Sequence, residues 1–286
     1  MDHFCYEGHR LAYTAYGEGP RTTVLLPGLL LSQTMQTPVA RQLAARGNRV
    51  ITLDPLGHGQ SDRPRETWQY SMSAFAQQTV ALLDHLELEQ AVVGGTSLGA
   101  NITLEVASAA PQRLRGMVIE MPVLDGAILA AGAAFTPLLF ALQFGEGAMR
   151  AVAGVARRVP RRPLPFLAQI GLDCLSQDPG PSAAVLAGIL YGRVAPDHNE
   201  RRRFETPGLV IGHPRDPLHP FSDAGMLAEE LPNGRLIDAR SILELRLKPE
   251  RLTREIGAFV DECWEAAPAR AAGTPGTPRR PRAASA

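Results

Sequence analysis

Short hydrophobic runs alternate with longer amphipathic runs along most of the chain. The short runs are mostly Val, Ile and Leu, a pattern typical of strands that are buried on both faces of a parallel sheet. We expect buried strands at Thr23–Leu26, Arg49–Leu53, Ala91–Gly94, Gly116–Glu120, Gly208–Ile211 and Arg235–Asp238. The longer runs predict helices at Thr34–Arg46, Met72–Leu86, Leu98–Ala109, Pro220–Leu231 and Pro249–Glu265. This alternation predicts an α/β fold, with helices flanking a mostly parallel sheet.

Three segments depart from this alternation. Near the N-terminus, Phe4–Tyr6 and Arg10–Tyr16 flank a Glu-Gly pair and predict an antiparallel hairpin. After Glu120 comes a long stretch without a convincing strand, made of Ala- and Leu-rich pieces interrupted by Gly and Pro. The end of the chain is small residues, Pro and Arg without periodicity, too little apolar surface to offset the entropy of ordering. The predicted division is therefore a core at 1–121 and 205–265, a helical lid at 122–204 over the strand ends, and a disordered tail at 266–286.

Charge and composition narrow the class of protein. The 286 residues carry no formal net charge, with 45% hydrophobic and 20% charged residues, as in an ordinary globular enzyme. This balance gives no electrostatic reason to expect a nucleic-acid partner. The apolar stretch Gly126–Leu142 is interrupted by Pro137, and we expect a buried lid helix there and no membrane span.

Cysteine usage and the N-terminal sequence bear on the compartment. Cys5, Cys174 and Cys263 are scattered and show no metal-type spacing, which favours reduced thiols. The first ten residues contain no apolar run of the kind found in signal peptides. We therefore expect a cytoplasmic protein.

The strongest chemical signal is a G-x-S-x-G motif at Gly95-Thr96-Ser97-Leu98-Gly99, between a predicted buried strand and a predicted helix. This strand–turn–helix context is the one that a nucleophile elbow requires. The turn is so tight that side chains at Gly95 and Gly99 would collide, which explains both glycines. The motif predicts that the Ser97 hydroxyl stands clear of the sheet, beside a helix N-terminus that favours developing negative charge.

Two upstream loops extend the pattern. LLPGLL at Leu25–Leu30 follows the first buried strand, and DPLGHGQSDRP at Asp54–Pro64 follows the second. Together with the elbow, these loops resemble the α/β-hydrolase superfamily, in its serine esterase or lipase-like branch. The resemblance covers roughly residues 10–121 and 205–265. It implies an eight-stranded, mostly parallel sheet with a helical lid insertion.

The resemblance also implies roles for single residues. The backbone N–H groups of Leu29 and Leu98 would form the oxyanion hole, and Pro27 in place of the usual His need not disable a hole built from main-chain donors. Asp216 is the candidate acid that orients a base, in a loop one residue longer than is common. Glu120 is an alternative position for the acid.

The histidine that usually completes the triad is missing from its expected place. In the resembling family a Gly-His pair stands a few residues before the Pro-Glu that opens the final helix. Here the final helix opens with Pro249-Glu250, and Ser241-Ile242 stands at the position of the Gly-His pair. No histidine follows His219. A different group could serve as base, and the candidates are His219 and Glu244 or another group in the stretch Arg240–Arg246. Alternatively, Ser97 serves only as a hydrogen-bond donor or has no chemical role.

Two classes of function stay open. The first is a serine-dependent hydrolase or acyl transferase that acts on a small apolar ester, lactone or thioester. The Leu- and Phe-rich lid indicates an apolar pocket that suits such a substrate. The second is a ligand-binding protein, or a non-hydrolytic enzyme of specialised metabolism such as a cyclase or isomerase, that has lost its base. No metal-ligand spacing or Gly-rich phosphate loop is present, so we expect no cofactor. The sequence leaves the substrate and the oligomeric state open.

Overall fold

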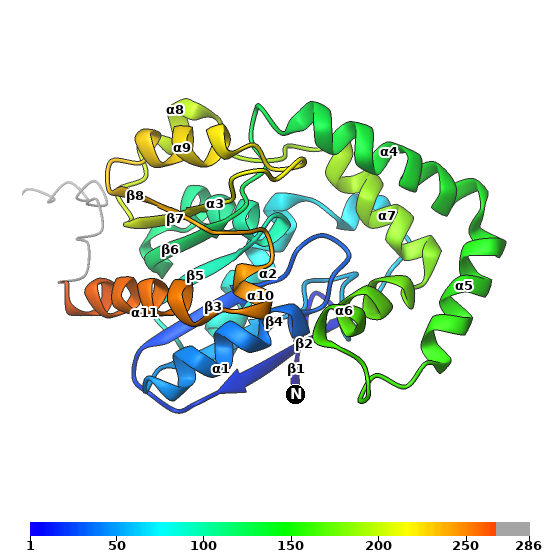
Figure 1. Ribbon diagram of the computed structural model, residues 1–286, viewed down its shortest axis with the longest axis horizontal. Coiled ribbons are helices and arrows are strands. Elements are labelled where there is room, and N and C mark those ends of the chain that lie inside the picture. The colour runs from blue at the N-terminus through cyan, green and yellow to red at the C-terminus, as the bar shows by residue number, and fades with distance from the viewer. Residues whose placement is uncertain (267–286) are drawn as a thin grey trace, which may run out of the picture.

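Eight strands form one twisted sheet at the centre of the molecule (Figure 1). The computed structural model describes residues 1–266, so the tail predicted at 266–286 lies, apart from its first residue, outside the described residues. The strand order is β1-β2-β4-β3-β5-β6-β7-β8. The two ladders that involve β2 are antiparallel and the others are parallel. The strands are β1 Asp2–Tyr6, β2 His9–Tyr16, β3 Thr22–Leu26, β4 Arg49–Leu53, β5 Ala91–Thr96, β6 Leu114–Glu120, β7 Gly208–Gly212 and β8 Gly234–Asp238.

Helices cover both faces of the sheet because successive strand residues point to opposite sides. Val24 and Val93 pack into one apolar cluster together with residues of α2, α3 and α9. Their chain neighbours Leu25 and Val92 pack into a second cluster with residues of α1, α10 and α11. The helices on the two faces are α2 Met72–His85, α3 Leu98–Ala109 and α9 Phe221–Glu230, against α1 Thr37–Ala45, α10 Glu244–Leu247 and α11 Glu250–Glu265.

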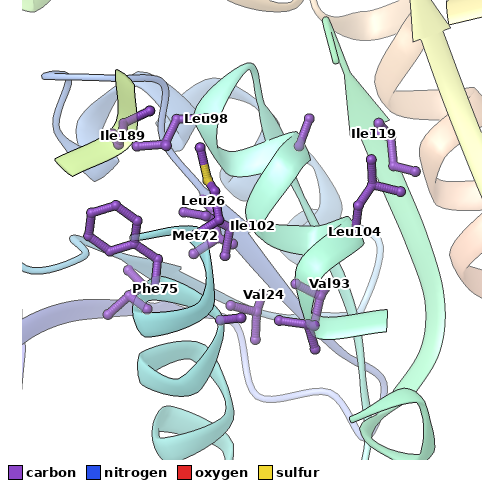
Figure 2. Close-up of a cluster of buried hydrophobic side chains, with 14 of the residues drawn as sticks. Val24, Leu26, Met72, Phe75, Val93, Leu98, Ile102, Leu104, Ile119 and Ile189 are labelled. Carbon is purple, nitrogen blue, oxygen red and sulfur yellow. The ribbon is translucent and has the colours of Figure 1, made fainter. Parts of the chain in front are cut away.

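Figure 2 shows the first of these clusters around α3. Ile102 of α3 lies beside Leu26 of β3, and Leu104 of α3 lies beside Ile119 of β6; all four side chains are fully buried. This packing holds α3, and with it the turn that precedes α3, against β3, β5 and β6.

The predicted fold class is confirmed, and each predicted strand is present within two residues of its expected bounds. One helix is divided. The run predicted at Thr34–Arg46 begins as a 3₁₀ turn, Gln33–Gln36, and continues as α1 from Thr37. Pro38 stands in the first turn of α1, where its missing N–H costs no hydrogen bond, so the α-helix begins there.

A helical insertion separates β6 from β7. Its four main helices form an arc at one end of the sheet, coloured green in Figure 1. They are α4 Ile128–Phe144, α5 Glu146–Arg158, α6 Phe166–Leu175 and α7 Pro179–Leu190; the short α8, His198–Arg201, follows. Within residues 1–266 no single helix is long and apolar enough to cross a membrane, although α4 and α5 together pass that test across a bend of 97°.

The burial predicted for the apolar stretch at Gly126–Leu142 is wrong. The stretch does form a helix, α4, but only Leu139 and Leu142 of α4 are fully buried. Leu129 and Phe144 are 85% and 81% exposed. The reason is position, because α4 lies on the outer side of the insertion, where it packs on α7 and α5 and leaves its other faces uncovered.

Candidate active site

Ser97 lies at the sharp turn between β5 and α3. Its backbone has φ +55° and ψ −108°, a conformation that costs a non-glycine residue roughly 1–3 kcal/mol. The surrounding structure holds this strain, since the Ser97 N–H donates to the backbone oxygen of Glu120 at 2.8 Å. The side chain is half-buried and lines a cavity. The chain thus forms the elbow that the motif predicts.

The glycines on either side of Ser97 allow the turn to close. A Cβ added to Gly95 would lie 2.7 Å from the Gly99 Cα, and a Cβ added to Gly99 would lie 2.6 Å from the Leu26 backbone oxygen. Cβ atoms essentially never come this close to backbone atoms. The steric reason predicted for both glycines agrees with the structure.

A histidine reaches Ser97 from the loop between β7 and α9. The Nε2 atom of His219 is 3.0 Å from the Ser97 Oγ, and its Nδ1 atom is 2.9 Å from the Asp216 Oδ2. One tautomer satisfies both contacts, with Nδ1–H donating to the carboxylate and Nε2 accepting from the serine hydroxyl. Hydroxyl, imidazole and carboxylate therefore form a continuous hydrogen-bonded chain.

The loop itself explains how an acid and a base three positions apart can face each other. Asp216 Oδ1 accepts hydrogen bonds from the backbone N–H groups of Leu218 and His219, at 2.8 and 3.0 Å. This Asx-type turn folds the chain back on itself and leaves Oδ2 free for the His219 ring. Burial alone would raise the pKa of Asp216, but the two N–H donors and the imidazole together lower it. The carboxylate therefore stays ionised opposite His219.

A histidine lies opposite Ser97, although none stands at the usual position after β8. The place after β8 is indeed filled by Ser241, whose backbone oxygen accepts a hydrogen bond from His213 Nδ1. His219, which comes from a different loop, nevertheless places its Nε2 3.0 Å from the Ser97 hydroxyl. Sequence alignment to the usual position could not reveal this, because the replacement comes from another element.

Glu244, the second candidate base, is held elsewhere. Its carboxylate accepts hydrogen bonds from the Arg251 guanidinium at 2.7 and 2.9 Å and from the Arg240 N–H at 2.5 Å. The Arg251 hydrogen bond is the main cause that lowers the pKa of Glu244. Glu244 does not line the cavity at Ser97, so the structure does not bring it to the hydroxyl.

Leu29 and Leu98, the predicted oxyanion donors, both line the cavity beside Ser97. Leu98 is the first residue of α3, so its N–H has no acceptor within the helix. Leu29 lies in the turn after β3, where the next residue, Leu30, has a positive φ of 55°. The structure brings these two residues to the same side of the elbow as the serine.

The other acidic and histidine residues considered from the sequence form hydrogen bonds or ion pairs in the protein interior. Glu120, the alternative acid, is fully buried and pairs with Arg246 at 2.7 Å, away from His219. His58 is also fully buried, with its Nδ1 3.0 Å from the backbone oxygen of Leu56. His213 lies between Ser241 and Glu120. Sequence reasoning did not single out Arg246 within the stretch Arg240–Arg246, because an arginine between leucines gives no signal of burial.

The cavity at Ser97 is apolar and has a volume of about 370 Å³. Helices α4 and α7 supply most of its wall opposite the elbow. The lining is Leu29, Met72, Ser97, Leu98, Asn101, Val123, Ile128, Ala131, Gly132, Phe135, Thr136, Leu139, Phe140, Gln143, Leu186, Ile189, Leu190, Tyr191 and Val194. Within residues 1–266 no group of three or more His, Cys, Asp or Glu side chains is arranged to hold a metal ion.

Comparison with known proteins assigns this architecture to a class. The family described as alpha/beta hydrolase fold matches residues 23–160, from β3 through α5. The enol-lactonase from Burkholderia xenovorans LB400 superposes with a TM-score of 0.74, at 19% identity over 91% of this chain and all of that one. A thermophilic esterase from Thermogutta terrifontis gives a TM-score of 0.70, at 21% identity over 91% of this chain and 97% of its own. The chain has the α/β-hydrolase fold, with a helical insertion at α4–α7.

Curated relatives match over shorter stretches. The 2-hydroxymuconate semialdehyde hydrolase of Pseudomonas sp. strain CF600 is 38% identical over 88 residues, which is 29% of this chain and 31% of that protein. The matched region spans about a third of the length of the first curated relatives.

Proposed function

We propose that the protein is a serine hydrolase that cleaves small, mostly apolar carboxylic esters, lactones or thioesters through an acyl-enzyme on Ser97. The observation that carries this proposal is the hydrogen-bonded chain from Ser97 through His219 to Asp216, with contacts of 3.0 and 2.9 Å. A serine hydroxyl needs such a neighbour, because it is a weak nucleophile until a base takes its proton.

Each group has a defined part in the first half of the reaction. As Ser97 Oγ forms a bond to the acyl carbon, its proton passes to His219 Nε2 and the carbonyl electron pair moves to oxygen. Asp216 holds the ring and stabilises the imidazolium that forms. The N–H groups of Leu29 and Leu98 receive the oxyanion. The electron pair on the oxyanion then re-forms the carbonyl, the bond between the acyl carbon and the leaving oxygen or sulfur breaks, and His219 gives its proton to that leaving atom.

Water completes the cycle by the same route in reverse. It loses a proton to His219 Nε2 as its oxygen bonds to the acyl carbon, and the ester bond to Ser97 Oγ breaks as that proton returns to the serine. The products are the free acid and the restored hydroxyl, and no further reactant is required.

The cavity supports the substrate class. Its wall is mainly Leu, Ile, Val, Ala, Phe and Met side chains, so it favours an apolar acyl or alcohol group. The fold neighbours named as an enol-lactonase and an esterase act, by those names, on bonds of this kind. Those names support the proposal, although the likeness itself concerns the fold.

The alternative functions, a ligand-binding protein or a non-hydrolytic enzyme, depended on the loss of the base. Because His219 lies within hydrogen-bond distance of Ser97 Oγ, that reason no longer favours them. They become outcomes of the test below.

The test is active-site labelling together with turnover. We expect a fluorophosphonate to label wild-type protein at Ser97 and the protein to hydrolyse p-nitrophenyl butyrate. Ser97→Ala should abolish labelling and lower kcat by a factor on the order of 10⁴ to 10⁶. Ser108→Ala is the matched control, because Ser108 is an exposed serine near the far end of α3.

Each outcome has a definite meaning. Ser108→Ala should label and turn over like wild type. A wild-type protein that is not labelled, yet binds an apolar ligand in the cavity, would favour the ligand-binding alternative. A Ser97→Ala variant as active as wild type would exclude the covalent mechanism.

A further inference from the structure

A buried ion pair lies directly behind the elbow. The Arg246 Nη2 is 2.7 Å from the Glu120 Oε2, and the two side chains are 6% and 4% exposed. Glu120 is the last residue of β6 and Arg246 comes from α10. Neither side chain lines the cavity of Ser97, so neither can touch a substrate there.

The pair is bound to the residue that precedes the serine. Thr96 Oγ1 donates a hydrogen bond to Glu120 Oε2 and accepts one from Arg246 Nη2 at 2.6 Å. It accepts a second from Gln36 Nε2 at 3.1 Å, and the same Gln36 nitrogen donates to the Leu26 backbone oxygen at 2.7 Å. The Thr96 hydroxyl thus uses its one donor and both acceptor sites.

Glu120 holds the elbow through its backbone as well. Its carbonyl oxygen accepts the hydrogen bond from Ser97 N–H at 2.8 Å, while its carboxylate accepts from Thr96. Thr96 and Ser97, the two residues of the elbow that set the direction of the Ser97 side chain, are therefore both hydrogen-bonded to Glu120. The strained φ of +55° at Ser97 needs such restraints to persist.

A contribution to the stability of the fold does not by itself explain why the ion pair between Glu120 and Arg246 is buried. Two charges taken out of water seldom stabilise a fold more than apolar side chains of the same volume would. Burial alone would raise the pKa of Glu120, but Arg246 above all, with His213 and Thr96, lowers it to about 2, so the carboxylate is charged. The pair does fix the orientation of the Thr96 hydroxyl to which it bonds, because charged hydrogen bonds are short and depend strongly on geometry.

We infer that Glu120 and Arg246 are positioning residues, which hold Thr96 so that the strained elbow keeps the Ser97 hydroxyl aimed at His219. The segment after β8, which in the resembling family carries the histidine, contributes Arg246 behind the nucleophile instead. This inference rests on the proposed function for its kinetic consequence, and on the hydrogen bonds at Thr96 and Ser97 for its structural one.

The decisive variant removes both charges at once. Glu120→Gln with Arg246→Met leaves no uncompensated buried charge, so the chain is expected to fold. We expect its kcat for p-nitrophenyl butyrate and its rate of fluorophosphonate labelling to fall at least tenfold, with KM within twofold of wild type. The amide of Ser97 should exchange with solvent at least tenfold faster. The single variant Arg246→Lys keeps a positive charge beside Glu120 but loses the planar guanidinium, so it should give values between those of wild type and the double variant.

A second buried pair provides the matched control. Arg201 of α8 and Glu230 of α9 lie 2.6 Å apart with side chains 2% and 8% exposed, and neither lines the cavity. Arg201→Met with Glu230→Gln should change the stability to urea by a similar amount and leave kcat and Ser97 exchange within twofold of wild type.

The outcomes separate this inference from the proposed function. Wild-type protein that does not react with the fluorophosphonate overturns the function, and unchanged Ser97 exchange in the Glu120/Arg246 double variant then overturns the inference as well. Reactive wild type with an equally reactive double variant overturns the inference alone. Equal losses of kcat in both double variants also overturn it, because the effect would then be one of general stability.

Discussion

The reactivity proposed for Ser97 depends on where its proton can go. In this structure the nearest acceptor is His219 Nε2, at 3.0 Å, and the opposite ring nitrogen is fixed by Asp216. The carboxylate is in turn fixed by two backbone N–H groups of its own loop. One short turn therefore supplies the acceptor, its orientation and the negative charge that stabilises it.

Replacing His219 with Ala should lower kcat for p-nitrophenyl butyrate by about 10²- to 10⁴-fold, the usual contribution of general acid–base catalysis. Steady-state kinetics will check this. His198→Ala is the matched control, because His198 is exposed at the start of α8. Glu244→Gln should also keep near wild-type turnover. An unchanged rate in His219→Ala would exclude this histidine as the base.

For single residues, the sequence was informative about the position of Ser97 and less informative about His219, the residue that contacts it. The glycines around Ser97 are required by contacts within the motif itself, so the motif alone indicates the turn. His219 is different, because its role depends on how the Asp216 turn folds and on where α9 begins. The spacing Asp-x-x-His between two prolines was the available signal, and it named His219 only as one of two candidates.

Among the elements, α4 has the most direct influence on what the cavity accepts. Ala131, Gly132 and Phe135 of this helix line the cavity with the elbow on the other side. A Cβ added at Gly132 would meet no atom within 4 Å, so a side chain can begin there without a clash at its first atom. Residue 132 is therefore a place where the volume of the cavity can be reduced.

Gly132→Leu should shift the preference of the enzyme toward short acyl chains. We expect the ratio of kcat/KM for p-nitrophenyl octanoate to that for p-nitrophenyl acetate to fall about tenfold or more, the effect of losing room for a methylene or two. Gly154→Leu is the matched control, since Gly154 in α5 is equally open and does not line the cavity. Equal ratios in both variants would show that α4 does not bound the acyl chain.

The pattern predicted both the element and its burial where an element contacts the sheet, but for α4 it predicted the helix and not the exposure of that helix. The strands and the helices on the sheet faces have an apolar period that burial explains. α4 is apolar all round, which predicts burial, yet its outer faces are exposed. The sequence of α4 alone could not reveal which neighbours it lacks.

For the whole molecule, the stability of the core depends on pH through a buried histidine. Burial above all lowers the pKa of His58 to about 4, from an ordinary 6.5, in a site where its ring packs against Phe75. Between these two values the unfolded chain binds a proton that the folded chain excludes. The free energy of unfolding therefore falls as the pH drops from 6.5 to 4, by about 3 kcal/mol from this group.

Urea unfolding at a series of pH values will test this. His58→Gln should show a shallower decline of stability between pH 6.5 and 4 than wild type, because Gln does not titrate. His198→Gln, at an exposed position, should keep the wild-type slope. If His58→Gln and wild type decline in parallel, His58 is not the group responsible.

The loop between β7 and α9 carries both partners of Ser97, and this has a mechanical consequence. In a design that takes acid and base from separate loops, a movement of either loop breaks the link between them. Here a displacement of the single loop carries imidazole and carboxylate away from the serine together, still paired with each other. The hydrogen bonds between Asp216 and His219 lie within this loop, and of the contacts in the chain Ser97–His219–Asp216 only the one to Ser97 joins it to another part of the protein.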